Sequence, residues 1–89
     1  MVYLIKYELN KPGKNYDNLY AALRAYEYTK DDTLHSAWFV STSWTADQIS
    51  NDIRAHMDDN DKLIVTRLRS GEHQGWLSQG VWDWISPRL

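Results

Sequence analysis

Residues 2–9 alternate between two kinds of side chain, and this alternation predicts a β-strand. The odd positions are all large and apolar or aromatic, so we expect this face to lie beneath helices. The even positions form a mixed face that should meet solvent or a partner, and they are Val2, Leu4, Lys6 and Glu8. Two further segments are rich in β-branched, aliphatic and aromatic residues, which favours strands: 34–42, as one strand or a bent pair, and 62–68.

Two segments have the spacing of amphipathic helices. From about Tyr16 to Tyr28, apolar residues recur every three or four positions, and Asn15 precedes them as a candidate N-cap. The second helix should begin after Thr45, because Thr45-Ala46-Asp47-Gln48 fits a capping box, and it should extend to about Met57. Its inward positions would be Ala46, Ile49, Ile53 and Met57.

The aromatic C-terminal element, residues 76–89, has two interpretations. The run VWDWI alternates like an edge strand, whereas Leu77, Val81 and Ile85 are spaced as on a helix. Both interpretations stay open at this point.

The order strand, helix, strand, helix, strand predicts a single α+β domain over residues 1–89. A split βαβ, ferredoxin-like sandwich, with two helices on one face of a mostly antiparallel sheet, is the natural solution. Right-handed crossovers would place both helices on the same side and leave the other sheet face bare. Because a second copy commonly covers such a face, we expect a homodimer.

Composition narrows the class of protein. The chain has no cysteine, which excludes disulfides and thiolate catalysis, and its net charge of −2 excludes a polyanion binder that works by bulk charge. No apolar run approaches the length of a membrane span, and the first residues lack the zones of a signal peptide, so we expect a cytoplasmic protein without a membrane partner.

Tryptophan and tyrosine are unusually frequent. There are five Trp and six Tyr against one Phe, and rings with a polar edge are typical of interfaces and base-stacking surfaces. The C-terminal cluster of Trp76, Trp82 and Trp84 is therefore a candidate interface.

Sequence motifs of nucleotide binding and nucleophilic catalysis are missing, and the three histidines match no zinc spacing. The run Asp58-Asp59-Asn60-Asp61 lacks the glycine and glutamate of a calcium loop, which favours a solvated turn.

Glu8 is the candidate catalytic and metal-binding residue. In a twofold dimer built on its face, two Glu8 carboxylates would approach each other and could hold Mg²⁺ or Mn²⁺, which can activate water on a phosphodiester. The alternative is an exposed strand end, paired with Lys6 or Arg67. Basic residues form the candidate nucleic-acid site, because adjacent strand ends would gather Lys11, Lys14, Arg67 and Arg69 into one patch.

The segments YLIKYEL, HSAWFVST and KLIVTRL, in this order, resemble the small dimeric CRISPR-associated ferredoxin-like proteins of spacer acquisition. VSTSWTADQISNDIR is similar to the second-helix region of the ferredoxin-like antitoxin that cleaves its toxin's messenger RNA. The resemblance implies that the acidic residue of the first strand is Glu8 and the serine of the second is Ser36. Glutamate stands where the family has aspartate, and its extra methylene moves the carboxylate by about 1.5 Å, which weighs against strict magnesium geometry.

Together these features predict a dimeric binding protein without catalysis, a regulator or adaptor for nucleic acid or protein. One alternative is a metal-dependent endonuclease with Glu8 as the cation ligand. The other is a purely protein-binding module that docks through its aromatic C-terminal element.

Overall fold

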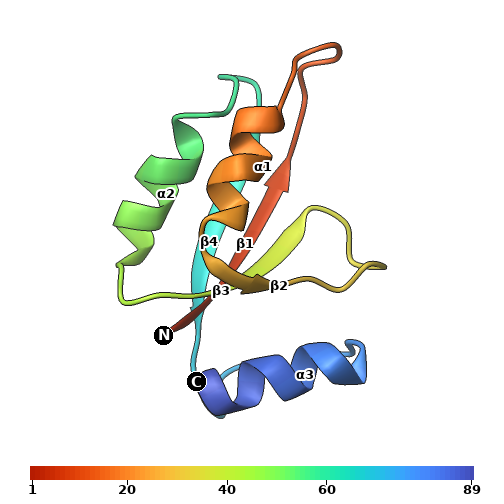
Figure 1. Cartoon of the computed structure of the whole chain (residues 1–89), viewed down its shortest axis with the longest axis vertical. Helices are drawn as coiled ribbons and strands as arrows, with labels where there is room; N and C mark the ends of the chain where they lie inside the picture. The colour runs from red at the N-terminus through yellow and green to blue at the C-terminus, as the bar shows by residue number, and fades with distance from the viewer.

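The computed structural model describes all 89 residues (Figure 1). In chain order its elements are β1 (Val2–Glu8), α1 (Asp17–Arg24), β2 (Glu27–Thr29), β3 (Ala37–Ser41), α2 (Ala46–Arg54), β4 (Lys62–Leu68), α3 (Gln79–Ile85) and a 3-10 turn (Ser86–Arg88). None of the helices has the length and apolar character needed to cross a bilayer.

The strands form one four-stranded sheet in the order β2-β3-β1-β4, and every neighbouring pair is antiparallel. The central strand β1 pairs along its whole length with β4, from Val2 opposite Leu68 to Glu8 opposite Lys62. The predicted α+β class with an antiparallel sheet is confirmed.

The main core lies between the sheet and the pair α1 and α2, which cover the same face (Figure 1). The predicted inward residues Tyr3, Ile5 and Tyr7 of β1 are buried here. They pack against apolar residues from both helices, namely Leu19, Leu23, Ile49, Ile53 and Met57. Alternation in the strand and helical spacing in the helices therefore identified this core correctly.

The capping box at the start of α2 is confirmed. The Thr45 hydroxyl accepts a hydrogen bond from the Gln48 amide at 3.2 Å, and the Gln48 side chain accepts one from the Thr45 amide at 2.9 Å. The helix ends at Arg54 rather than Met57, although Met57 still reaches the core from the following turn.

The first helix is shorter than its periodicity predicts, and the expectation that it extends to Tyr28 is wrong. Residues 27–29 form the edge strand β2 instead. Pairing with β3 and the contact of Tyr28 with the Trp38 ring, with centroids 4.7 Å apart, outweigh the local helical preference. Asn15 is not the N-cap, yet its side chain accepts a hydrogen bond from the Asp17 amide at 2.8 Å.

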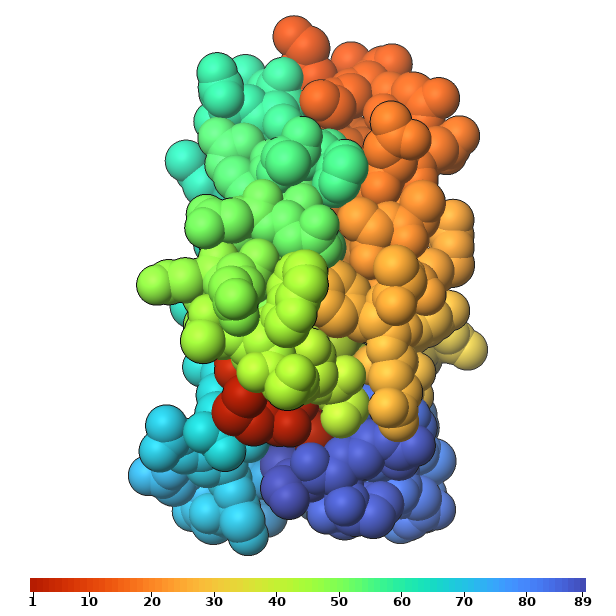
Figure 2. All heavy atoms as spheres, turned by 60° about the vertical axis from the view of Figure 1, so that its left-hand side comes forward, coloured from red at the N-terminus to blue at the C-terminus, as the bar shows by residue number.

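The C-terminal element contains the helix α3, which covers part of the sheet face opposite α1 and α2. Val81 and Ile85 of α3 are buried against Val2 and Phe39, which point away from α1 and α2. The expectation of a wholly bare sheet face is therefore wrong, because α3 closes the end of the sheet where the chain begins (Figures 1 and 2). The half of that face near Lys6 and Glu8 stays exposed.

Candidate functional site

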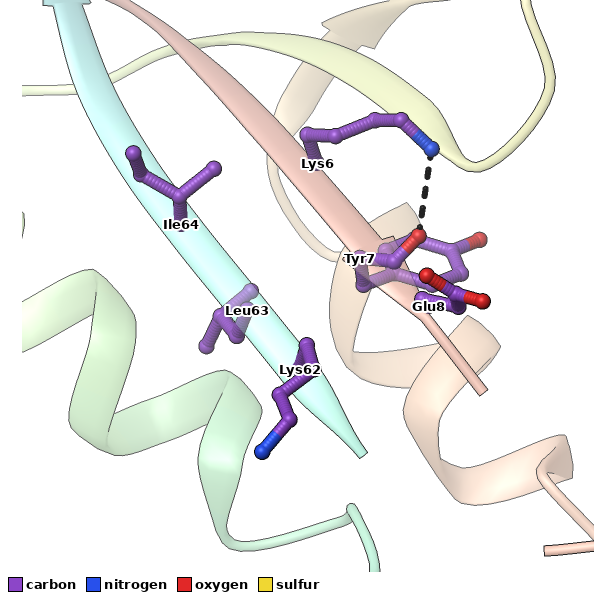
Figure 3. Close-up of a pocket in the computed structure, with 6 residues that line it drawn as sticks. All are labelled: Lys6, Tyr7, Glu8, Lys62, Leu63 and Ile64. Carbon is purple, nitrogen blue, oxygen red and sulfur yellow. Dashed lines mark hydrogen bonds between the residues drawn. The ribbon is translucent and has the colours of Figure 1, made fainter. Parts of the chain in front are cut away.

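Glu8 ends β1 on the part of the sheet face that α3 leaves uncovered. It lines an open cavity of about 220 Å³ together with Lys6 and Lys62, and the latter is its direct neighbour on β4 (Figure 3). The Lys6 ammonium donates a hydrogen bond to the Tyr7 carbonyl at 3.3 Å. The Glu8 side chain is exposed and has no hydrogen-bond or ion-pair partner within the chain.

One chain does not assemble a set of metal ligands around Glu8. Nowhere in the structure do three side chains among His, Asp and Glu converge closely enough to hold an ion. Two lysines line the cavity together with this single carboxylate, and their positive charge opposes the binding of a cation. A cation site at Glu8 would therefore need ligands from a second chain.

The basic residues expected to form one patch lie at opposite ends of the sheet. β1 and β4 are antiparallel, so Lys11 and Lys14 follow the end of β1 that adjoins Lys62, whereas Arg67 and Arg69 adjoin its beginning. The rise of a seven-residue strand separates the two pairs by about 20 Å. The expectation of a single patch is wrong, because it overlooked the direction of the strands.

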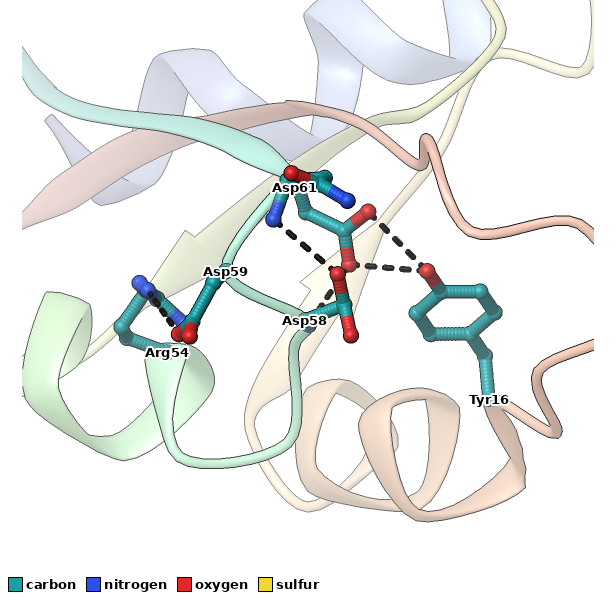
Figure 4. Close-up of polar contacts among 6 residues, drawn as sticks. Tyr16, Arg54, Asp58, Asp59 and Asp61 are labelled. Carbon is teal, nitrogen blue, oxygen red and sulfur yellow. Dashed lines mark hydrogen bonds and ion pairs between the residues drawn. The ribbon is translucent and has the colours of Figure 1, made fainter.

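The acidic turn before β4 has a buried centre (Figure 4). The Asp61 carboxylate accepts hydrogen bonds from the Asn10 amide at 2.6 Å, the Asp58 amide at 2.8 Å and the Tyr16 hydroxyl at 2.8 Å. Burial alone would raise the pKa of Asp61, but these bonds and the charge of Lys14 hold it below its ordinary value. Desolvation and the bond to Asp61 raise the pKa of Tyr16 to about 12. The turn thus joins the loop before α1 to β4.

The three C-terminal tryptophans have different environments. Trp82 and Trp84 pack against the smaller core under α3, and the Arg88 guanidinium lies 4.3 Å from the centre of the Trp84 ring. Trp76, in contrast, is 100% exposed. Trp82 and Trp84, which the sequence suggested for an interface, are therefore partly buried within the domain.

Trp76 stands at the rim of an apolar cavity of about 300 Å³, which we call the aromatic groove. Its walls come from the sheet, the loop before β3, the segment leading to α3 and α3 itself. The lining residues are Leu4, Leu34, Phe39, Leu68, His73, Gln74, Gly75, Trp76, Leu77 and Trp82. The His73 and Trp82 rings are stacked, with centroids 6.0 Å apart. No lysine or arginine lines the groove.

A third cavity, of about 480 Å³, opens between the end of α1 and α2. The Tyr26 hydroxyl donates to Asp52 at 2.7 Å, and the Tyr26 ring meets the exposed Trp44 edge-on. Burial and the bond to Asp52 raise the pKa of Tyr26.

Sequence reasoning missed Asp31, whose buried carboxylate accepts a hydrogen bond from the Ser78 amide and thereby joins the loop after β2 to the start of α3. Of the aromatic groove, the sequence indicated only Trp76 and Trp82, as members of the candidate C-terminal interface. The rest of its walls come from other parts of the chain and were not predicted. Neither a protein-family model, nor a curated protein, nor a solved structure matches this chain.

Proposed function

We propose that this chain is a ferredoxin-like binding protein, an adaptor or regulator that engages a protein partner by inserting an apolar side chain of that partner into the aromatic groove. The observation that carries the proposal is the complete exposure of Trp76 beside an apolar cavity. Large aromatic residues in partly formed pockets are characteristic centres of protein–protein interfaces.

The charges around the groove favour a protein over a nucleic acid. Binding of nucleic acid draws most of its free energy from phosphates held by lysine and arginine. The groove contains neither, and the four basic residues expected to hold phosphates are divided between the two ends of the sheet. With a net charge of −2, the chain also lacks a general attraction for polyanions.

The ferredoxin-like assignment is part of this proposal. The strand order β2-β3-β1-β4 and the packing of α1 and α2 on one face support it. The resemblance to CRISPR-associated spacer-acquisition proteins remains a prediction, as does the cytoplasmic location.

A dye-binding experiment tests the groove directly. The dye 8-anilinonaphthalene sulfonate fluoresces on apolar surface. Its fluorescence should rise with the wild-type chain and fall in Trp76→Ser and Leu34→Ser. Trp44→Ser, which removes an exposed tryptophan outside the groove, is the matched control and should behave as wild type.

Affinity purification followed by reconstitution tests the partner. A protein that the wild type and Trp44→Ser retain, and that Trp76→Ser loses, should bind the purified wild-type chain with the same dependence on Trp76. Co-purification of RNA or DNA would overturn the proposal in favour of a nucleic-acid partner if its binding weakens steeply as salt rises and is also weakened by Lys11→Glu or Lys14→Glu.

A further inference from the structure

β4 is an edge strand whose outer backbone has no partner within the chain. Its only neighbour is β1, and their register is unbroken from Val2↔Leu68 to Glu8↔Lys62. Outside the helices and the sheet ladders, no backbone hydrogen bond involves residues 62–68. Alternate amide and carbonyl groups of such a strand point outward, and they offer a template for pairing with another strand.

The side chains of β4 do little to prevent such pairing. The strand contains no proline, and the continuous register excludes a bulge. Within β4, Ile64 is 59% exposed on one face of the sheet, while Leu63 and Val65 are half-buried on the opposite face. Within the strand only Lys62 and Arg67 carry charge. Edge strands that avoid association are usually shorter, bulged or more highly charged.

The charges at the two ends of β4 are complementary to each other. The acidic turn Asp58–Asp61 precedes the strand, and Arg67 and Arg69 lie at its end, with no acidic residue between Asp61 and Glu72. The Asp59 side chain is fully exposed, and one of its oxygens lies 3.3 Å from the half-exposed Arg54 guanidinium. Two antiparallel copies of β4 would place the basic end of each beside the acidic turn of the other.

We propose that two copies of this chain pair antiparallel through β4 and join their sheets into one of eight strands. With the twofold axis at Val65, all seven residues of β4 pair with the partner subunit's strand. In this register, Ile64 faces Thr66 of the partner subunit, and Arg67 faces Leu63 of the partner subunit. No like charges are opposed, and Arg69 lies beside the acidic turn of the partner subunit, where the exposed Asp59, rather than the buried Asp61, offers its charge.

This interface differs from the sheet-face dimer expected from the sequence, and it does not rest on the proposed function. The aromatic groove and the edge of β4 are separate surfaces that separate variants can test. A variant that loses partner binding at the aromatic groove should therefore still form the β4 dimer, and a variant that loses the dimer should still bind the partner.

A single engineered cysteine tests the axis. The wild type should sediment at twice 10.5 kDa at micromolar concentration. Because the chain has no cysteine, Val65→Cys offers one thiol per copy, and directly opposed residues of antiparallel strands lie within disulfide reach. Mild oxidation should give a covalent dimer with Val65→Cys and none with Asn51→Cys, an exposed position of α2.

Charge variants test the register. Ile64→Lys and Arg69→Glu should each raise the dimer dissociation constant by about tenfold or more. Asp59→Lys added to Arg69→Glu should restore association, whereas Arg24→Glu on α1 should leave it unchanged. A monomeric wild type would overturn the proposal. A dimer that keeps its affinity in Ile64→Lys and Arg69→Glu, or that Trp76→Ser dissociates, would also overturn it, because it would use another surface.

Discussion

The carboxylate of Asp31 accepts a 2.7 Å hydrogen bond from the backbone amide of Ser78, 47 residues further along the chain. The other carboxylate oxygen accepts bonds from the amide and hydroxyl of Thr33 at 3.0 and 2.7 Å. Ser78 is the N-cap of α3 and makes no side-chain cap of its own. Asp31, which is only 4% exposed, thereby holds the beginning of α3 against the loop that joins β2 to β3.

Asp31→Ala should lower the melting temperature and loosen α3, because it leaves the Ser78 amide and both Thr33 donors without their acceptor. Near-ultraviolet circular dichroism should report the change through Trp82 and Trp84, which belong to α3 and pack against the smaller core. Asp32→Ala, at the exposed neighbouring position, is the control. Equal melting of the two variants would show that Asp31 does not anchor the helix.

The free energy of unfolding should decrease in acid. The hydrogen bond from the Ser78 amide, together with those from Thr33, holds the pKa of Asp31 far below its ordinary value of 3.8. The pKa of Asp61 is also lowered. A carboxyl group with a lower pKa in the folded state stabilises the fold above its unfolded pKa. It loses that contribution as the pH falls through the folded value.

Stability should therefore begin to fall as the pH drops toward 3.8 and decrease further below it. Denaturant titrations at stepped pH measure this slope. The slope should be smaller in Asp31→Asn, which cannot titrate at that position. An equal slope in the wild type and Asp31→Asn would contradict the assignment.

Thr45→Ala should destabilise the domain by about 0.5–2 kcal/mol, because it removes the acceptor of the Gln48 amide at the start of α2. Denaturant unfolding measures the difference. Thr42→Ala, near the end of β3 and outside the capping box, is a suitable comparison, since its hydroxyl accepts only the exposed Trp44 amide. An unchanged free energy of unfolding in Thr45→Ala would show that the box contributes nothing.

Glu8→Gln tests the endonuclease alternative. On the proposed function, the wild type should cleave neither RNA nor DNA with Mg²⁺ or Mn²⁺. Cleavage that disappears in Glu8→Gln, with unchanged melting temperature and mass, would instead identify Glu8 as a cation ligand, because the substitution removes charge and nearly preserves shape. Glu72→Gln, on the loop after β4, is the matched control.

Local patterns were sufficient for much of the fold. Alternation placed Tyr3, Ile5 and Tyr7 in the core, and the spacing of Thr45 and Gln48 located the start of α2. These features depend on residues close together in the chain, so the sequence displays them directly.

Features built from distant residues were not predictable in this way. β2 forms only because Glu27 to Thr29 meet β3, and α3 depends on Asp31, far away in the chain. The separation of Arg67 and Arg69 from Lys11 and Lys14 follows from strand direction, which composition does not reveal. For the same reason the sequence indicated Trp76 and Trp82 as a candidate interface but not the residues of the sheet that complete the aromatic groove.

The sheet separates two hydrophobic clusters, and the larger one is complete without α3. The smaller cluster depends on Val81 and Ile85 of α3. That helix is held by the loop after β4, by the Asp31 contact at its beginning and by the ion pair between Arg88 and Glu27 beyond its end. Such a division creates two cooperative units of unequal resistance to opening. Amide protons of residues 81–85 should thus exchange with deuterium before those of β1, and the transient opening would uncover Val2 and Phe39 while the rest of the domain stays folded.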